Sequence, residues 1–162
     1  MTVSEWVEIM SRRGGVCNDY MRKLAAVEGK SDMFRVLCDA NGGAWLFDLH
    51  AKGLPLPVEA FMEEYKLYID GRHVVAYPQG YSSKMYCRYS GELVADTTLV
   101  YLLECRGADI TVPKYSYPSV ILSKGCDVRI AMEPGSRLNV ETYGGAKYSI
   151  SGDMSRVRIK NH

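Results

Sequence analysis

The amino-terminal part of the chain places its apolar side chains at helical spacing. Val3, Trp6 and Met10 repeat every three to four positions, the period that gives a helix one apolar face. The same spacing recurs from about Asn18 to Val27 and between Ser31 and Asn41. Glycines follow each stretch, and glycine is the residue that most often ends a helix. The pattern therefore predicts three consecutive helices.

The next stretch, AWLFDLHAKG, fits two structures. Lys52-Gly53 followed by Pro55 favours a short helix, because a glycine after the last turn and a proline beyond it are typical stop signals. A strand over Trp45 to Leu49 is the alternative. The apolar spacing then predicts a further helix from Val58 to about Tyr65.

Beyond these helices the apolar period changes to two. The segment KLYIDGRHVVAY contains Asp70-Gly71 between two runs of β-forming residues, which is a strong hairpin signal. Strands are also predicted over residues 84–89 and 98–105. After Arg106, apolar-x-apolar pairs recur, and their first members are 10, 8, 10, 10 and 9 residues apart. The pairs are Ile110/Val112, Val120/Leu122, Val128/Ile130, Leu138/Val140, Tyr148/Ile150 and Val157/Ile159.

A near-constant spacing of short strands favours a β-solenoid or β-roll, because each turn buries its apolar pair against its neighbours. A small antiparallel sandwich is the alternative, since it also carries turn signals every ~8–12 residues. We expect an α+β protein in which a helical half, residues 1–65, packs on a repetitive β half, residues 66–162. The two halves are expected to form one compact unit.

Composition narrows the class of protein. With 47% hydrophobic residues the chain can bury a sizeable core, and a net charge of +1 argues against a dedicated nucleic-acid-binding protein. The first residues lack the basic stretch of a signal peptide, and no apolar run approaches ~18 residues, so no membrane span is expected. The five cysteines are scattered, which is typical of reduced thiols in a cytosol. We therefore expect a cytoplasmic protein.

Cys17 is the first candidate for catalysis. It is expected to begin a helix, where unpaired N–H groups favour a thiolate. GVCNDYMRKLAAV resembles the cysteine helix of transglutaminase-like enzymes, and RGGVC is similar to a segment of the arylamine N-acetyltransferases. Both families use a Cys–His–Asp triad, and the resemblance implies Cys17, His73 and Asp96 as its members. It covers about thirteen residues and no acid motif follows, so we expect Cys17 to be structural.

No cofactor or metal site is expected. The chain has three histidines and no C-x-x-C pair, whereas structural zinc sites are built from closely spaced ligands. The glycines follow the strand repeat and match no phosphate-binding loop motif.

Aromatic and basic residues gather in the segment YPQGYSSKMYCRY. On a strand, Lys84, Tyr86 and Arg88 share one face, which we predict to face solvent and to bind a partner. Tyrosine and arginine anchor many interfaces and stack on bases. The opposite face, predicted to lie in the core, carries Met85, Cys87 and Tyr89. The high β propensity of tyrosine is a simpler explanation of the same pattern.

A longer stretch, GGVCNDYMRKL…FRVLCDANGGAWLFDLHAKGLPLP, resembles small uncharacterised proteins encoded by phages and mobile elements of gut bacteria. The resemblance implies a gene outside core metabolism, where binding a host or virion partner is commoner than catalysis. We therefore expect a non-enzymatic protein that captures a host protein or a nucleotide-type ligand in the host cytosol, with opposition to host defence as one such role. The alternatives are a Cys17-dependent transglutaminase-like or acyltransferase-like enzyme and a structural virion component.

The last predicted strand bears on assembly. A regular stack of strands leaves an unpaired edge at Val157–Lys160, and such edges are normally capped or paired. Pairing with a second copy around a two-fold axis is the simplest closed arrangement, so a homo-oligomer is expected. Arg156, Arg158 and Lys160 offer a competing explanation, because charge alone can protect an edge.

Overall fold

The computed structural model describes residues 42–54, 75–76 and 82–162, together with six isolated positions before residue 27. The predicted helices before residue 42 lie outside the described residues, apart from five positions that are helical. These positions are Glu5, Glu8, Arg12, Arg22 and Lys23. The predicted helix over 58–65 and the hairpin at Asp70-Gly71 also lie outside the described residues, so these expectations stay predictions.

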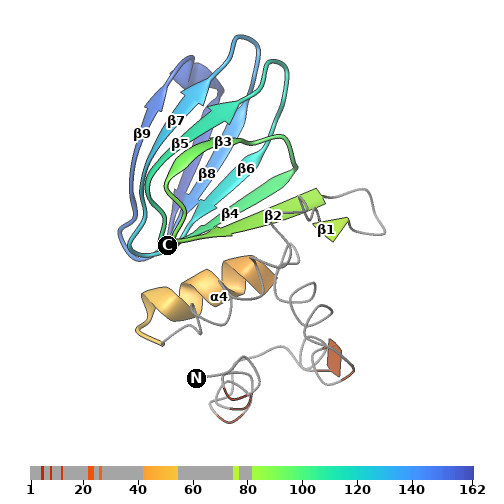
Figure 1. Ribbon diagram of the computed structural model, residues 1–162, viewed down its shortest axis with the longest axis vertical. Helices are drawn as coiled ribbons and strands as arrows, with labels where there is room; N and C mark the ends of the chain where they lie inside the picture. The colour runs from red at the N-terminus through yellow and green to blue at the C-terminus, as the bar shows by residue number, and fades with distance from the viewer. Residues whose placement is uncertain are drawn as a thin grey trace.

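The carboxyl-terminal part of the chain is a parallel β-solenoid of about 4 turns (Figure 1). Each turn gives one strand to a six-stranded sheet, ordered β1-β2-β4-β6-β8-β10, and one to a four-stranded sheet, ordered β3-β5-β7-β9. Every pairing is parallel except that of β1 with β2. The strands are β1 (Val75–Ala76), β2 (Ser82–Cys87), β3 (Gly91–Val94), β4 (Leu99–Leu103), β5 (Arg106–Val112), β6 (Ser119–Leu122), β7 (Asp127–Met132), β8 (Leu138–Thr142), β9 (Lys147–Ser151) and β10 (Val157–Asn161), and a short 3-10 helix, η1 (Met154–Arg156), precedes β10.

The parallel pairing decides between the two predicted β architectures. All six apolar pairs of the sequence lie in β5 to β10, which confirms them as strand positions. Val100 pairs with Val120 and Val120 with Val140, so one turn of the coil takes 20 residues and contains two of the predicted short strands. An antiparallel sandwich would reverse the direction of neighbouring strands. The solenoid is therefore the observed fold, and the sandwich alternative is wrong.

Aliphatic side chains fill the space between the two sheets. Val100, Val120 and Val140 form a column on the six-stranded sheet, and none of them is exposed. Ile110 and Ile130 form a matching column on the four-stranded sheet and are 1% and 2% exposed. Burying each such side chain stabilises the fold by roughly 1.5–3 kcal/mol relative to leaving it in water. The interior of the solenoid is thus a closed hydrophobic core.

The ambiguous stretch before the solenoid is a helix, α4 (Gly42–Ala51). It ends as the sequence predicts, because Gly53 adopts the left-handed φ of +88°. The Gly53 amide donates to the His50 carbonyl at 3.1 Å, and the Leu54 amide donates to the Leu49 carbonyl at 3.0 Å. This pair of bonds is a Schellman motif, which satisfies the last carbonyls of a helix. The helix prediction is confirmed and the strand alternative over Trp45 to Leu49 is wrong.

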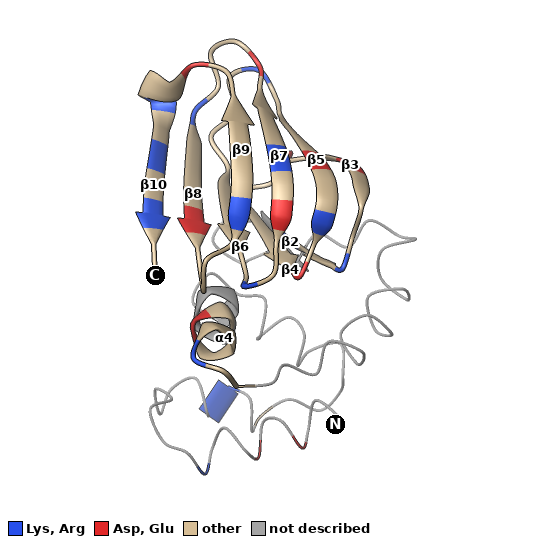
Figure 2. Ribbon diagram, turned by 90° about the vertical axis from the view of Figure 1, so that its left-hand side faces the viewer, with Lys and Arg blue, Asp and Glu red and all other residues tan. Residues whose placement is uncertain are grey.

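Helix α4 lies beside the carboxyl ends of the even-numbered strands, where the chain turns into the second sheet (Figures 1 and 2). Phe47 anchors it there and is completely buried. Its ring meets Tyr101 of β4 edge to face at 5.8 Å and Tyr143, just after β8, at 6.2 Å. Tyr143 in turn stacks on His162 with a centroid distance of 4.3 Å. One aromatic cluster therefore joins α4 to β4 and to the end of β8.

Replacing Phe47 with alanine tests this anchor. We expect Phe47→Ala to lower the free energy of unfolding by about 3–5 kcal/mol, because it empties a buried aromatic site between two rings. Phe47→Leu is the matched control and should lose about half as much, since it keeps most of the buried volume. Urea denaturation followed by circular dichroism measures both. A loss below about 1 kcal/mol for Phe47→Ala would show that α4 is not docked through this side chain.

Tyr143 should give the fold a distinct alkaline limit. Burial, reinforced by the charges of Glu141 and Asp48, raises the pKa of Tyr143 from 10.0 to about 12. Between these values the unfolded state releases the proton first, so stability falls as the pH rises from 10 to 12. The drop in unfolding free energy from about pH 9 to about pH 11 should be about 1 kcal/mol smaller in Tyr143→Phe. Equal drops in both proteins would contradict the raised pKa.

Candidate functional site

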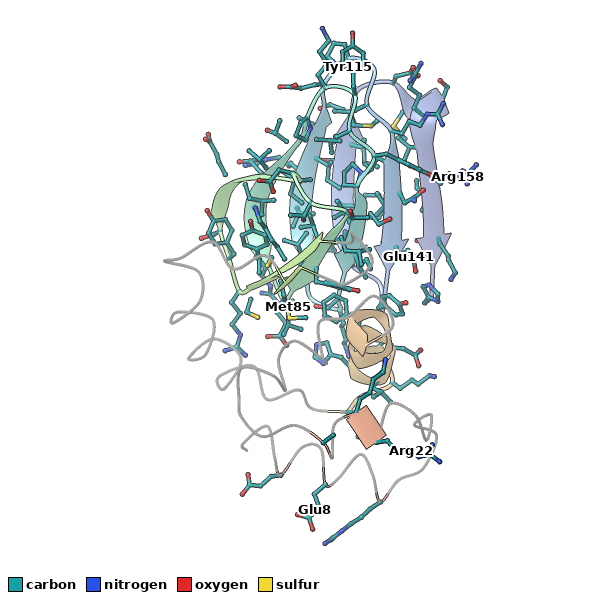
Figure 3. The ribbon with its side chains drawn as sticks, turned by 90° about the vertical axis from the view of Figure 1, so that its right-hand side faces the viewer. Glu8, Arg22, Met85, Tyr115, Glu141 and Arg158 are labelled. Carbon is teal, nitrogen blue, oxygen red and sulfur yellow. The ribbon has the colours of Figure 1, made fainter. Side chains whose placement is uncertain are left out.

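The predicted binding residues Lys84, Tyr86 and Arg88 do not form one solvent-facing stripe. Lys84 is in register with Val100 and Tyr86 with Leu102, so both lie on the inner side of the sheet, at the first turn of the solenoid. The alternation itself was predicted correctly, because Met85 and Cys87 on the opposite side are buried (Met85 is labelled in Figure 3). Between Lys84 and Cys87, both faces of β2 are therefore covered. Only Arg88, which follows the end of β2, is exposed.

Lys84 and Tyr86 close the first turn of the solenoid. The Lys84 ammonium contacts the Asp96 carboxylate at 2.6 Å, and the Lys84 side chain is only 14% exposed. Tyr86 packs on the core with its ring 5.4 Å from that of Tyr89, the third residue predicted to lie in the core. Burial raises the pKa of Tyr86, and the charge of Asp96 and the neighbouring Tyr89 add to this effect. These contacts suit a cap on the hydrophobic interior.

The predicted Cys17–His73–Asp96 triad is described at one of its three positions. Cys17 and His73 lie outside the described residues, and Asp96 is the partner of Lys84. Among the cysteines that are described, Cys105 is buried, and its thiol donates to the Tyr86 carbonyl at 3.2 Å. A hydrogen bond with Cys126 and burial both raise the pKa of Cys105, which keeps this thiol protonated and unreactive.

A pocket of about 670 Å³ lies where the even-numbered strands turn into the odd-numbered ones, against the end of α4. We call it the corner pocket. Figure 2 shows this end of the strands, where β5 and β9 begin with basic segments and β7 with an acidic one, on the side where α4 lies. The pocket is lined by His50, Gly53, Leu54, Arg88, Ser90, Glu104, Arg106, Lys124 and Gly125. Four of these side chains are positively charged or become so on protonation, and one is acidic. The lining of the pocket therefore favours an anion.

Glu104 bridges two of the basic groups. One carboxylate oxygen lies 2.9 Å from Nε of Arg88, and the other lies 3.2 Å from Nε2 of His50. Glu104 therefore joins the first turn of the solenoid to α4 across the pocket. The side chains of Arg88, Glu104 and His50 are 43%, 26% and 14% exposed, which leaves the bridge accessible to water.

Two basic groups of the corner pocket remain outside this bridge. Nε of Arg106 donates to the Gly125 carbonyl at 3.2 Å, a contact that holds the guanidinium without neutralising its charge. Lys124 is exposed and has no ion pair with any residue in the described part of the chain. Arg106 and Lys124 thus keep their charge available to an incoming anion.

The backbone at the pocket is strained at two residues that are not glycine. Arg88 and Glu104 have φ values of +47° and +52°, in the left-handed region that costs most residues about 1 kcal/mol or more. The next turn places Gly125, with a φ of +87°, in the same corner, and glycine adopts this conformation freely. Strain of this kind is concentrated at functional sites. Tyr115, outside the pocket, has a φ of +60° as well, so this backbone conformation is not confined to the pocket.

Of the predicted binding residues, Arg88 lines the pocket. The other charged residues of the pocket were not predicted from the sequence. His50, Glu104, Arg106 and Lys124 come from α4 and from two successive turns, and no local motif joins them. Their one common signal is the 20-residue step from Glu104 to Lys124, which equals the repeat of the solenoid. This step becomes informative only when the turn is known to contain two strands.

Metal ligands, membrane-spanning helices and similar proteins are the remaining indications of function to consider. Within residues 42–54, 75–76 and 82–162 and the isolated positions, no group of three or more His, Cys, Asp or Glu is placed to hold a metal ion. Over the same residues, no helix combines the length and the apolar content needed to cross a membrane. Comparison of the chain with protein-family models, curated proteins and solved structures finds no match.

Proposed function

We propose that this protein is a non-enzymatic binding protein that captures a small nucleotide-type ligand, and that the corner pocket holds the ligand's phosphate groups. The observation that carries the proposal is the charge of the pocket: among its described lining residues, Arg88, Arg106, Lys124 and His50 are basic and Glu104 is the single acid. Its volume of about 670 Å³ is within the range of small-molecule sites, which is roughly 300–1,000 Å³.

The kinds of basic side chain favour phosphate. Arginine offers a planar set of donors that matches the oxygens of phosphate, and lysine adds a compact positive charge. Arg88 and Arg106 come from successive turns and face one pocket together with Lys124, so several phosphate oxygens can be bound at once. The solenoid supplies a rigid frame, which limits the entropy lost when the ligand binds.

The biological setting of the proposal follows the resemblance to proteins of phages and mobile elements. A protein of that kind would act in the host cytosol, and removing a nucleotide signal is one way to oppose host defence. A binding protein needs no catalytic group for this role. For this role the corner pocket must only bind the ligand with a higher affinity than the host receptor does.

Isothermal titration calorimetry with pyrophosphate and with ADP tests the pocket. We expect saturable binding of both, and we expect Arg88→Gly and Lys124→Ala each to weaken it about tenfold, the effect of losing roughly 1.5 kcal/mol from one charged hydrogen bond. The glycine also relieves the left-handed backbone at position 88, which offsets part of the stability lost with the contacts of the Arg88 side chain.

Tyr115→Gly is the matched control for that substitution. Tyr115 has a φ of +60° and is 77% exposed, and it lies at the opposite end of the strands from α4 (Figure 3). Its replacement relieves the same kind of strain and should leave the affinity unchanged. Wild-type protein that binds neither compound, or an Arg88→Gly variant that binds as the wild type does, would contradict the proposed function.

We also propose that the protein assembles into a homo-oligomer, most simply a dimer, through the last turn of the solenoid. The outer edge of β10 pairs with no strand in the described part of the chain. Apolar groups gather beside it, where Met154 is 51% and Ile159 is 46% exposed. A second copy paired along this edge would cover both the apolar side chains and the unpaired backbone groups.

Light scattering at micromolar concentration measures the state of assembly. The proposal predicts a mass above the 18.2 kDa of one chain, and it predicts that Ile159→Lys shifts the mass to that of the monomer. Val94→Lys is a matched control, because Val94 is also an exposed apolar strand residue, at 48%, but lies in β3 of the other sheet. A monomeric wild-type protein would leave the charges of Arg158 and Lys160 as the protection of the edge.

A further inference from the structure

We infer that Glu104 is a built-in competitor of the ligand, and that the corner pocket therefore selects groups with adjacent negative charges, such as a diphosphate, over a single carboxylate. Glu104 contacts both Arg88 and His50, and a ligand must displace it to reach them. The inference rests on the proposed function, because it concerns the selectivity of the same site.

The contacts of Glu104 are those that a bound carboxylate would make. Each of its two oxygens contacts a different basic partner, at 2.9 Å on Arg88 and at 3.2 Å on His50. A free monocarboxylate offers these two partners nothing that Glu104 does not already provide. A diphosphate carries more charge and has enough oxygens to reach Arg106 and Lys124 as well. The Glu104 carboxylate thus prevents a single free carboxylate from binding to Arg88 and His50.

The bridge is built so that it can open. Ion pairs as exposed as Arg88–Glu104 contribute little free energy, because water screens them. The backbone of Glu104 is held in place, because its amide donates to the Ser123 hydroxyl at 2.8 Å. Displacement therefore requires only a rotation of the Glu104 side chain into the solvent.

A purely structural role for Glu104 makes the opposite prediction. If the residue only ties α4 to the solenoid, then weakening the bridge should loosen His50 and lower the affinity for anions. If it competes with the ligand, then removing its charge should raise the affinity. Glu104→Gln separates the two, because the amide oxygen can still accept from Arg88 while the negative charge is lost.

The matched control is Glu141→Gln. Glu141 also contacts a histidine, His162, at 3.1 Å and a basic side chain, Lys160, at 3.8 Å, but it does not line the corner pocket. Its replacement changes the net charge of the protein by the same amount. Any gain in affinity from the overall charge will therefore appear in both variants, and a gain from the pocket will appear in Glu104→Gln alone.

Calorimetric titration with pyrophosphate, repeated in the presence of acetate, decides the matter. We expect Glu104→Gln to bind pyrophosphate about fivefold or more tightly than the wild type, as removal of a nearby like charge implies, and Glu141→Gln to bind as the wild type does. We expect acetate to compete poorly in the wild type. If wild type and Glu104→Gln bind pyrophosphate equally, or the variant binds it more weakly, the inference that Glu104 competes with the ligand is refuted, while the proposed binding function stands. If neither protein binds pyrophosphate, both proposals fail.

Discussion

Each turn of the solenoid is hydrogen-bonded in parallel register to the turn before it, and this places residues about 20 positions apart side by side. A single turn cannot bury its own apolar side chains, because it presents only one strand to each sheet. The columns of Val100, Val120 and Val140 become a core only because the turns repeat without a shift. Side-chain placement everywhere else in the solenoid follows from this stacking.

The same stacking builds the corner pocket. Arg88 and Glu104 directly follow Cys87 and Leu103, which are in register, so their side chains come from adjacent turns at one corner. Lys124 follows one turn later. The order of charges along this column is positive, negative, positive, and the central Glu104 reduces the repulsion between its neighbours. In the proposed function, a ligand with two or more negative charges takes over this role when it displaces Glu104, so the cations stay balanced.

The sequence contains enough information for most of the fold that the structure describes and for little of the site. The apolar pairs from Ile110 to Ile159 identify the strands, and Gly53 identifies the end of α4, because both patterns are local. Strand spacing alone could not separate a solenoid from a sandwich, because pairing direction is a property of residues 20 apart. Alternation places Lys84 and Tyr86 on one face of β2, but it does not tell which faces of the strand are covered. In this protein the core covers one face of β2. Met85, on the other face, is buried as well.

The pocket also depends on the contact between α4 and the solenoid. His50 reaches Glu104 only because Phe47, one turn earlier on the same helix, is fixed between Tyr101 and Tyr143. A ligand that contacts both His50 and Arg106 is held by the helix and by the solenoid at the same time. Its binding free energy then adds to the free energy that keeps α4 docked, since a ligand stabilises the state that binds it. The aromatic cluster therefore sets the position of His50 beside Glu104, so the docking of α4 and the make-up of the corner pocket depend on each other.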